Sequence, residues 1–141
     1  FIFLNLRMRI KTIFWIASLL LIFQVAPLII SIFSIDFKML LITDAFGPDV
    51  SSDAIQMFDT FSLVTSSVII GIIFMIIGSL SIRDLSALRK LSFLFFIVMG
   101  FLALPDLIFV LTGKPTAPLP VIIANFTTIG IFLYGAKRGN I

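Results

Sequence analysis

Long stretches with few or no charged side chains constrain this chain more than any other feature of its sequence. Residues 12–35 contain none, and three further apolar stretches follow at about 54–82, 91–112 and 119–136. A helix needs about 20 mostly apolar residues to cross the hydrocarbon core of a bilayer. Hydrophobic residues make up 60% of the sequence and charged residues 12%, against roughly 45–50% and 25% in soluble domains. We therefore predict an all-α integral membrane protein, a four-helix bundle that forms one transmembrane domain over residues 1–141.

The charges between the apolar stretches alternate in sign. Basic residues precede the first stretch, dominate the connection 83–90 and follow the last stretch, whereas the connection 36–53 is acidic. Because short loops rich in Lys and Arg stay in the cytoplasm, both termini and the hairpin 83–90 are predicted to be cytoplasmic, with 36–53 as an external loop. We expect this multi-pass protein in the bacterial inner (plasma) membrane. The basic residues in question are Arg7, Arg9, Lys11, Arg83, Arg89, Lys90, Lys137 and Arg138.

The N-terminal region has two interpretations. Met8 is an alternative start to Phe1, and from Met8 the order of basic and then apolar residues resembles a signal peptide. The stretch 12–35 is longer than the apolar core of a typical signal peptide, so we interpret it as a retained helix. Pro27 lacks a backbone donor and predicts a kink in this helix, with a substrate-related break as the alternative.

Two further local patterns stand out. Residues 37–46 are apolar enough to lie at the membrane surface as a short helix or a re-entrant cover. Asp53 and Gln56 have the spacing of a helix N-cap and its partner, so the second helix is expected to start near Ala54. That helix also carries a stripe of small residues on one face, which permits close packing against a helix of this chain or of another copy. The stripe consists of Ser67, Gly71 and Gly78.

Asp106 is the centre of the one candidate site. It lies inside the third apolar stretch, about 9 Å below the outer end by helical rise, and an ionisable residue at such depth is a functional-site hypothesis by default. Asn125, Thr65 and Ser66 are expected at a similar level, with Gln24 deeper. If these side chains converge, they form a polar pocket that opens outward between the helices.

Two alternatives to such a pocket remain open. The polar side chains would also suit hydrogen bonds that hold the helices together, each worth about 0.6 kcal/mol. In addition, Pro105 would suit a membrane helix that ends early, which would leave Asp106 at the interface with water. Under either alternative, the group would be structural.

The composition excludes several chemistries. The chain has no Cys and no His, and all seven acidic residues are Asp. No catalytic residue, metal site, haem or iron–sulfur ligation is therefore predicted, and we expect no enzyme. Asp49 and Asp53 lack the ligand spacing of a calcium loop. The basic residues lie at helix ends, so no nucleic acid is expected as a partner. The 17 Phe residues would suit a bound lipid tail, quinone or carotenoid, or simply contact with lipid.

The sequence resembles the DoxX-like group of small four-helix membrane proteins. The resemblance covers residues 8–136 and implies an accessory or uncharacterised integral membrane protein. It rests on Pro27, on Asp-Ala-Ile-Gln-Met-Phe at 53–58, on the hairpin Arg-Asp-Leu-Ser-Ala-Leu-Arg-Lys at 83–90 and on Leu-Thr-Gly-Lys-Pro at 111–115.

We expect a non-catalytic structural or accessory subunit, in contact with membrane lipids and with other membrane-protein subunits or further copies of itself. The alternative is a binding or transport module for a small or hydrophobic molecule, with an outward-facing pocket around Asp106.

Overall fold

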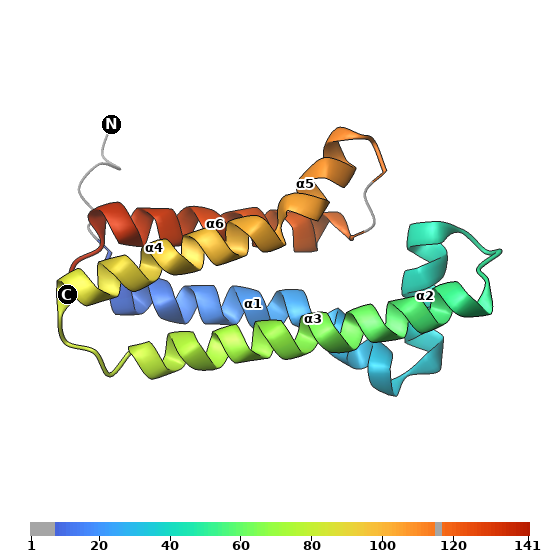
Figure 1. The fold of residues 1–141 in the computed structure, drawn as a ribbon, viewed down its shortest axis with the longest axis horizontal. Helices are drawn as coiled ribbons and strands as arrows, with labels where there is room; N and C mark the ends of the chain where they lie inside the picture. The colour runs from blue at the N-terminus through green and yellow to red at the C-terminus, as the bar shows by residue number, and fades with distance from the viewer. Residues whose placement is uncertain (1–7, 115–116) are drawn as a thin grey trace.

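All the regular secondary structure in the part of the chain that the structure describes is helical. This computed structural model describes residues 8–114 and 117–141, which contain no β-sheet. Four of the helices are long and apolar enough to cross a membrane, and they lie side by side along the long axis (Figure 1). The predicted helical membrane bundle with four spans is therefore confirmed. In order, the helices are α1 (Ile10–Phe33), α2 (Ile35–Phe46), α3 (Ser52–Ser79), α4 (Leu85–Leu102), α5 (Leu104–Leu111) and α6 (Leu119–Arg138).

Helix α1 is central to the packing. It contacts α3 and α6, and α4 packs in turn against α6, so the closest contacts run in the order α3–α1–α6–α4. The two short helices lie at the same end of the bundle, where α2 packs against α1 and α5 turns away from the axis of α4 (Figure 1). The long helices thus form a continuous series of contacts, with α3 and α4 at its two ends.

A buried aromatic cluster joins three of the four spans. Phe14 of α1, Phe95 of α4 and Phe132 of α6 are buried, with ring centroids 5.4 to 6.2 Å apart. Aromatic pairs at such distances stabilise a core by about 0.5–1.5 kcal/mol each beyond the burial of their surface. Aliphatic side chains of α1, α3 and α4 complete this core, among them Leu21, Ile76 and Met99.

The two ends of the described chain meet at one end of the bundle. The amide of Ile10 donates to the carbonyl of Asn140 (2.7 Å), and the amide of Asn140 donates to the carbonyl of Met8 (3.2 Å). The Arg89 guanidinium donates twice to the carbonyl of Gly139, at 2.9 and 2.7 Å, which ties α4 to the end of α6. These contacts hold three separate segments of the chain together at that end.

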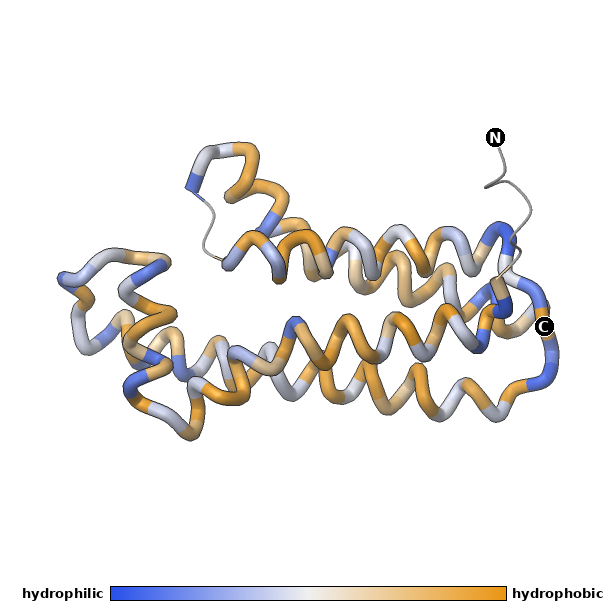
Figure 2. The backbone as a smooth tube through the Cα atoms, turned by 180° about the vertical axis from the view of Figure 1, so that it is seen from behind, coloured by the Kyte–Doolittle hydropathy of each residue, from blue (hydrophilic) through white to orange (hydrophobic). Residues whose placement is uncertain are grey.

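The two ends of the bundle differ in charge. The end where the chain termini meet carries Arg9, Lys11, Arg83, Arg89, Lys90, Lys137 and Arg138, and we call it the basic end. The opposite end carries Asp36, Asp44, Asp49, Asp53 and Asp59, and we call it the acidic end. Figure 2 shows hydrophilic segments at both ends and mostly hydrophobic helices between them. Of the residues discussed above, Phe1, Arg7 and Pro115 lie outside the described part.

The connection between α3 and α4 is shorter than predicted. The hairpin expected over 83–90 is already helical from Leu85 onward. Its first turn is capped by Asp84, whose carboxylate oxygens accept from the amides of Ser86 (3.0 Å) and Ala87 (3.1 Å). A carboxylate at an N-cap stabilises the start of a helix because it satisfies amides that have no helical partner. Arg89 and Lys90 therefore lie inside α4 and not in a loop.

The single helix predicted over 91–112 is wrong, because the chain bends at Ala103 and forms two helices, α4 and α5. Pro105 explains the bend. Its nitrogen carries no hydrogen and cannot donate to the carbonyl four residues earlier, and its ring crowds that carbonyl. Asp106 consequently lies in the first turn of α5. The structure thus has the early helix end of the Pro105 alternative, whereas the position of Asp106 at the interface with water stays a prediction.

Three other local expectations can be compared with the structure. The short helix expected over 37–46 is α2. Helix α3 starts earlier than predicted because Ser51, and not Asp53, caps it by accepting from the amide of Ala54 (3.2 Å). Helix α1 continues through Pro27 without a break.

Candidate functional site

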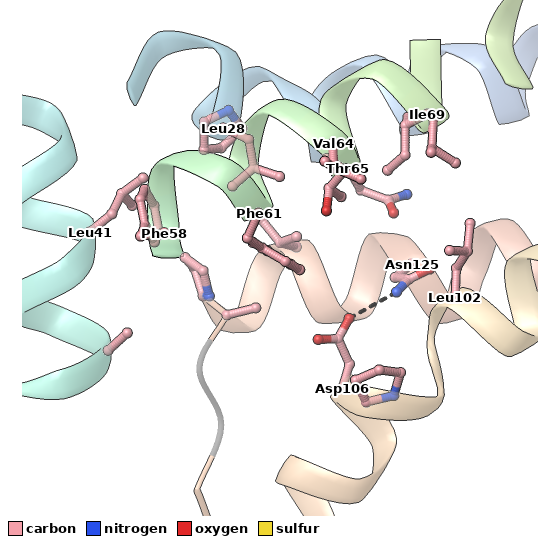
Figure 3. A pocket seen from close by; sticks show the side chains of 18 of the residues that line it. Leu28, Leu41, Phe58, Phe61, Val64, Thr65, Ile69, Leu102, Asp106 and Asn125 are labelled. Carbon is pink, nitrogen blue, oxygen red and sulfur yellow. Dashed lines mark hydrogen bonds between the residues drawn. The ribbon is translucent and has the colours of Figure 1, made fainter. Parts of the chain in front are cut away.

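A cavity of about 450 Å³ lies at the acidic end of the bundle, beyond the aromatic cluster. All six helices or their adjoining residues contribute to it, and Met99 belongs both to the cavity wall and to the buried core. Phe61 and Leu102 line it and are also exposed at the protein surface, so the cavity is open to its surroundings (Figure 3). Most of the lining is apolar, and its polar side chains are Gln24, Asp44, Thr65, Asp106 and Asn125.

Asp106 and Asn125 form a hydrogen-bonded pair in the cavity wall. Nδ2 of Asn125 donates to Oδ2 of Asp106 at 3.0 Å, between the first turn of α5 and the second turn of α6 (Figure 3). Because a carboxylate only accepts, Asn125 must present its NH₂ group to Asp106. The amide oxygen of Asn125 is then a buried acceptor, and no donor among the described residues reaches it.

The bend at Pro105 places this pair. A straight continuation of α4 would carry Asp106 along the same axis, whereas the turn at Ala103 starts a new helix whose first turn lies beside α6. Asp106 is only partly buried, while Asn125 is 8% exposed. The pair therefore combines a sheltered amide with a carboxylate that still reaches the cavity.

Thr65 and Gln24 complete the polar part of the lining. Thr65 of α3 faces the Asp106–Asn125 pair from the opposite wall (Figure 3). Gln24 of α1 is buried, and its Nε2 donates to the hydroxyl of Thr128 at 2.9 Å. That hydroxyl donates in turn to the carbonyl of Ala124 at 2.7 Å. Gln24 thus links α1 to α6 at the inner end of the cavity.

Thr128 was not among the candidate residues, although the sequence contains a signal for it. It follows Asn125 by three residues, and residues three apart share one face of a helix. The spacing of Asn125 and Thr128 therefore predicts a polar face on α6.

Ser66 does not belong to the cavity. It is 4% exposed, and α3 packs chiefly against α1, so its hydroxyl lies in a helix contact and has no partner among the described residues. Ser62, one turn earlier, is buried in the same way. The predicted group of five side chains is thus brought together at the cavity except for Ser66, which faces another direction from its neighbour Thr65.

The stripe of Ser67, Gly71 and Gly78 is exposed. A Cβ atom added to either glycine would meet no atom of the described residues within 4 Å. The close contact with another helix of this chain is therefore made by a different face of α3, which carries Ser62 and Ser66. A contact of the stripe with another copy stays a prediction.

Helix α2 closes one side of the cavity. Its residues Leu41, Asp44 and Phe46 contribute to the lining. The helix is tied to α3 by a salt bridge of 2.6 Å between Lys38 Nζ and Asp59 Oδ1. This bridge holds α2 over the acidic end of α3.

The cavity offers the chemistry of binding. Among the described residues no three carboxylates gather closely enough to hold a metal ion. The hydroxyl of Thr65 lies beside no His or Lys in the lining that would activate it as a nucleophile. The lining combines an apolar volume with a few fixed polar groups, which is the usual composition of a site that orients a small molecule.

Comparisons with protein-family models, with curated proteins and with solved structures find no match to this chain. The resemblance to the DoxX-like group consequently stays a prediction that depends on the residues named for it.

Proposed function

We propose that this integral membrane protein binds a small apolar molecule in the cavity at its acidic end. The observation that carries the proposal is a cavity of about 450 Å³ with a hydrogen-bonded Asp106–Asn125 pair in its wall. Protein interiors are packed closely and leave few voids larger than a water molecule. Ligand sites, in contrast, typically have volumes of about 300–1,000 Å³ and apolar walls with a few polar groups.

The two interhelical hydrogen bonds in this region have different surroundings. The bond from Gln24 to Thr128 is buried, with Gln24 7% and Thr128 0% exposed, although Gln24 also lines the inner end of the cavity. The bond from Asn125 to Asp106 uses one carboxylate oxygen, and Asp106 stays partly exposed to the cavity. One oxygen of Asp106 thus remains available to a molecule in the cavity, which favours a binding role for this pair.

The aromatic cluster favours binding from one side over conduction through the protein. Phe14, Phe95 and Phe132 fill the space between α1, α4 and α6 on the basic side of the cavity. A molecule in the cavity would therefore not pass through the bundle to the basic end. By the positive-inside rule, the basic end faces the cytoplasm and the cavity faces outward. In a bacterial cell, this would be the periplasmic side of the inner membrane.

Cysteine labelling tests this orientation, because the chain has no cysteine of its own. Ser52→Cys places a thiol at the acidic end and Ser81→Cys places one at the basic end, and both positions are exposed. A membrane-impermeant maleimide added to intact cells should label Ser52→Cys and leave Ser81→Cys unlabelled until the cells are opened. Labelling of Ser81→Cys in intact cells would show that the basic end faces outward and would contradict this orientation.

The binding role is tested by the small molecules that remain with the protein after extraction from native membranes in mild detergent. Mass spectrometry should find one species at a stoichiometric level with the wild type. Val121→Phe, which adds a ring in the cavity wall, should lose it. Val98→Phe makes the same change at an exposed position outside the lining and should keep it. Equal amounts in all three proteins, or none in the wild type, would contradict the proposal.

An accessory subunit is the second candidate, and helix α5 favours it. This helix is apolar, has no buried side chain and projects from the bundle, so a neighbouring protein or lipid must cover it in the membrane (Figure 1). The same purification would reveal a stoichiometric protein partner. Phe109→Ser, on the exposed surface of α5, should release that partner if α5 is the contact.

A further inference from the structure

We infer that the molecule bound in the cavity is a lipophilic cation, such as an apolar amine or a quaternary ammonium compound. This inference rests on the proposed binding function and specifies the chemistry of the ligand. Its basis is the charge of the lining, which contains the two carboxylates of Asp44 and Asp106 and, among the described residues, no Lys or Arg.

The basic residues at the acidic end are placed elsewhere. Lys38 of α2 is engaged with Asp59 at 2.6 Å. Lys114, after α5, is exposed and does not line the cavity. The cavity therefore has a negative lining that no side chain of the described residues neutralises within it. A positive charge on the ligand would supply the missing partner.

The environment of Asp106 points the same way. One of its oxygens accepts from Asn125, and the other has no hydrogen-bond partner among the described residues and is turned away from Asn125 (Figure 3). Around it lie apolar side chains of α3, α4 and α6, which solvate a carboxylate poorly. A cationic group placed against this second oxygen would make a charge-assisted contact in surroundings where water competes little.

The aromatic lining fits the same class of ligand. Phe46, Phe58, Phe61 and Phe101 belong to the wall, and Figure 3 shows Phe58 and Phe61 on the α3 side of the cavity. Aromatic rings attract cations through their quadrupole in addition to contacting apolar groups. An apolar ligand with a positive centre would thus find favourable partners for both of its parts.

Other occupants fit less well. A fatty acid or an anionic lipid would bring a second negative charge toward Asp106. A neutral quinone, carotenoid or acyl chain would fill the volume but would remove water from Asp106 without giving its second oxygen a partner. Only a cation both fills the apolar volume and compensates the carboxylates.

Two probes of opposite character test the inference on the purified full chain in zwitterionic lipid nanodiscs. Tetraphenylphosphonium is an apolar cation, and pyrene is a neutral apolar molecule. Asp106→Asn removes the charge and keeps the side-chain shape. We expect it to weaken tetraphenylphosphonium binding by about tenfold or more, which corresponds to about 1.4 kcal/mol, and to leave pyrene binding unchanged. Unchanged pyrene binding also shows that the variant is folded.

Two further variants separate the possible failures. Asp49→Asn, an exposed position outside the lining, should bind both probes as the wild type does. Val121→Phe should lose both probes, because its ring occupies part of the cavity one helical turn before Asn125. If Val121→Phe loses both while Asp106→Asn keeps its affinity for tetraphenylphosphonium, the cation inference is overturned and the binding function stands. If Val121→Phe binds both probes as well as the wild type, the cavity is not their site and both proposals fail.

Discussion

A methyl group added at Gly135 should destabilise the fold more than a methyl group added at Gly130, the other glycine of α6. An ideal Cβ there would lie 2.6 Å from Oγ of Ser92 and 3.4 Å from two carbons of Ile13. Ser92 is fully buried, and its hydroxyl donates to the carbonyl of Phe132 at 2.7 Å across the contact of α4 with α6. The alanine would therefore displace a hydroxyl that already has a fixed role.

The expected loss combines three terms. Overpacking of a close helix contact costs about 1–3 kcal/mol. Turning the Ser92 hydroxyl away from Phe132 loses a hydrogen bond worth about 0.6 kcal/mol in a membrane protein. Alanine gains up to about 1 kcal/mol over glycine in a helix interior, which offsets part of the cost. We expect Gly135→Ala to lower the free energy of unfolding by about 1–3 kcal/mol.

Unfolding in mixed detergent and SDS micelles measures this change, and α6 itself provides the control. Gly130→Ala adds the same methyl group where no atom of the described residues lies within 4 Å, so it should be neutral or stabilising. In a Ser92→Ala background the clashing oxygen is absent, and Gly135→Ala should then cost clearly less. Equal stability of Gly135→Ala and Gly130→Ala would refute the close packing described for α4 and α6.

Three other perturbations have defined outcomes. Thr128→Val should destabilise more than Gln24→Leu in the same unfolding assay, because it leaves the buried Gln24 amide without its acceptor; the reverse order would contradict the 2.9 Å bond between them. Arg89→Ala should increase hydrogen exchange at the end of α6, since both guanidinium bonds to Gly139 are lost, and Arg89→Lys should restore little of the protection. Asp84→Ala should cost about 1 kcal/mol of stability through the lost helix cap, and no change would mean that the cap is not formed in the membrane.

The spans and the central polar pair were accessible from the sequence because both depend on position along the helix axis. Length and lack of charge determine where a helix can cross the bilayer. Counted by helical rise along the predicted helix 91–112, Asp106 lies at a similar depth to Asn125, although in the structure it belongs to α5, beyond the end of the third span. The structure joins these two side chains by a hydrogen bond.

The sequence does not predict in the same way how each helix is rotated about its own axis. In a soluble helix the polar face marks the solvent, but lipid is as apolar as the core, so α3 carries apolar residues all around. Small residues occur on two of its faces, and the face with Ser62 and Ser66 is the buried one, while Ser67 is exposed. This rotation separates Thr65 in the cavity from Ser66 in the helix contact.

The sequence predicted the break before α5 only as an alternative to a continuous helix. Pro105 permits either a kinked helix that continues or a helix that ends, because neighbouring helices can compensate for the lost hydrogen bond. The residue at which α4 starts depends on whether Asp84 belongs to a loop or caps the helix. The charge pattern alone does not distinguish these two possibilities.

The central claim is that an apolar cavity lies between α3 and the Asp106–Asn125 pair, and two neighbouring residues test it most directly. In a chain without native cysteine, N-phenylmaleimide should modify Thr65→Cys, which lines the cavity, far faster than Ser66→Cys, which is buried in the contact with α1. Adding Val121→Phe should slow the reaction of Thr65→Cys, and adding Val98→Phe should not. Equal rates for Thr65→Cys and Ser66→Cys, or no effect of Val121→Phe, would contradict the cavity and the function proposed for it.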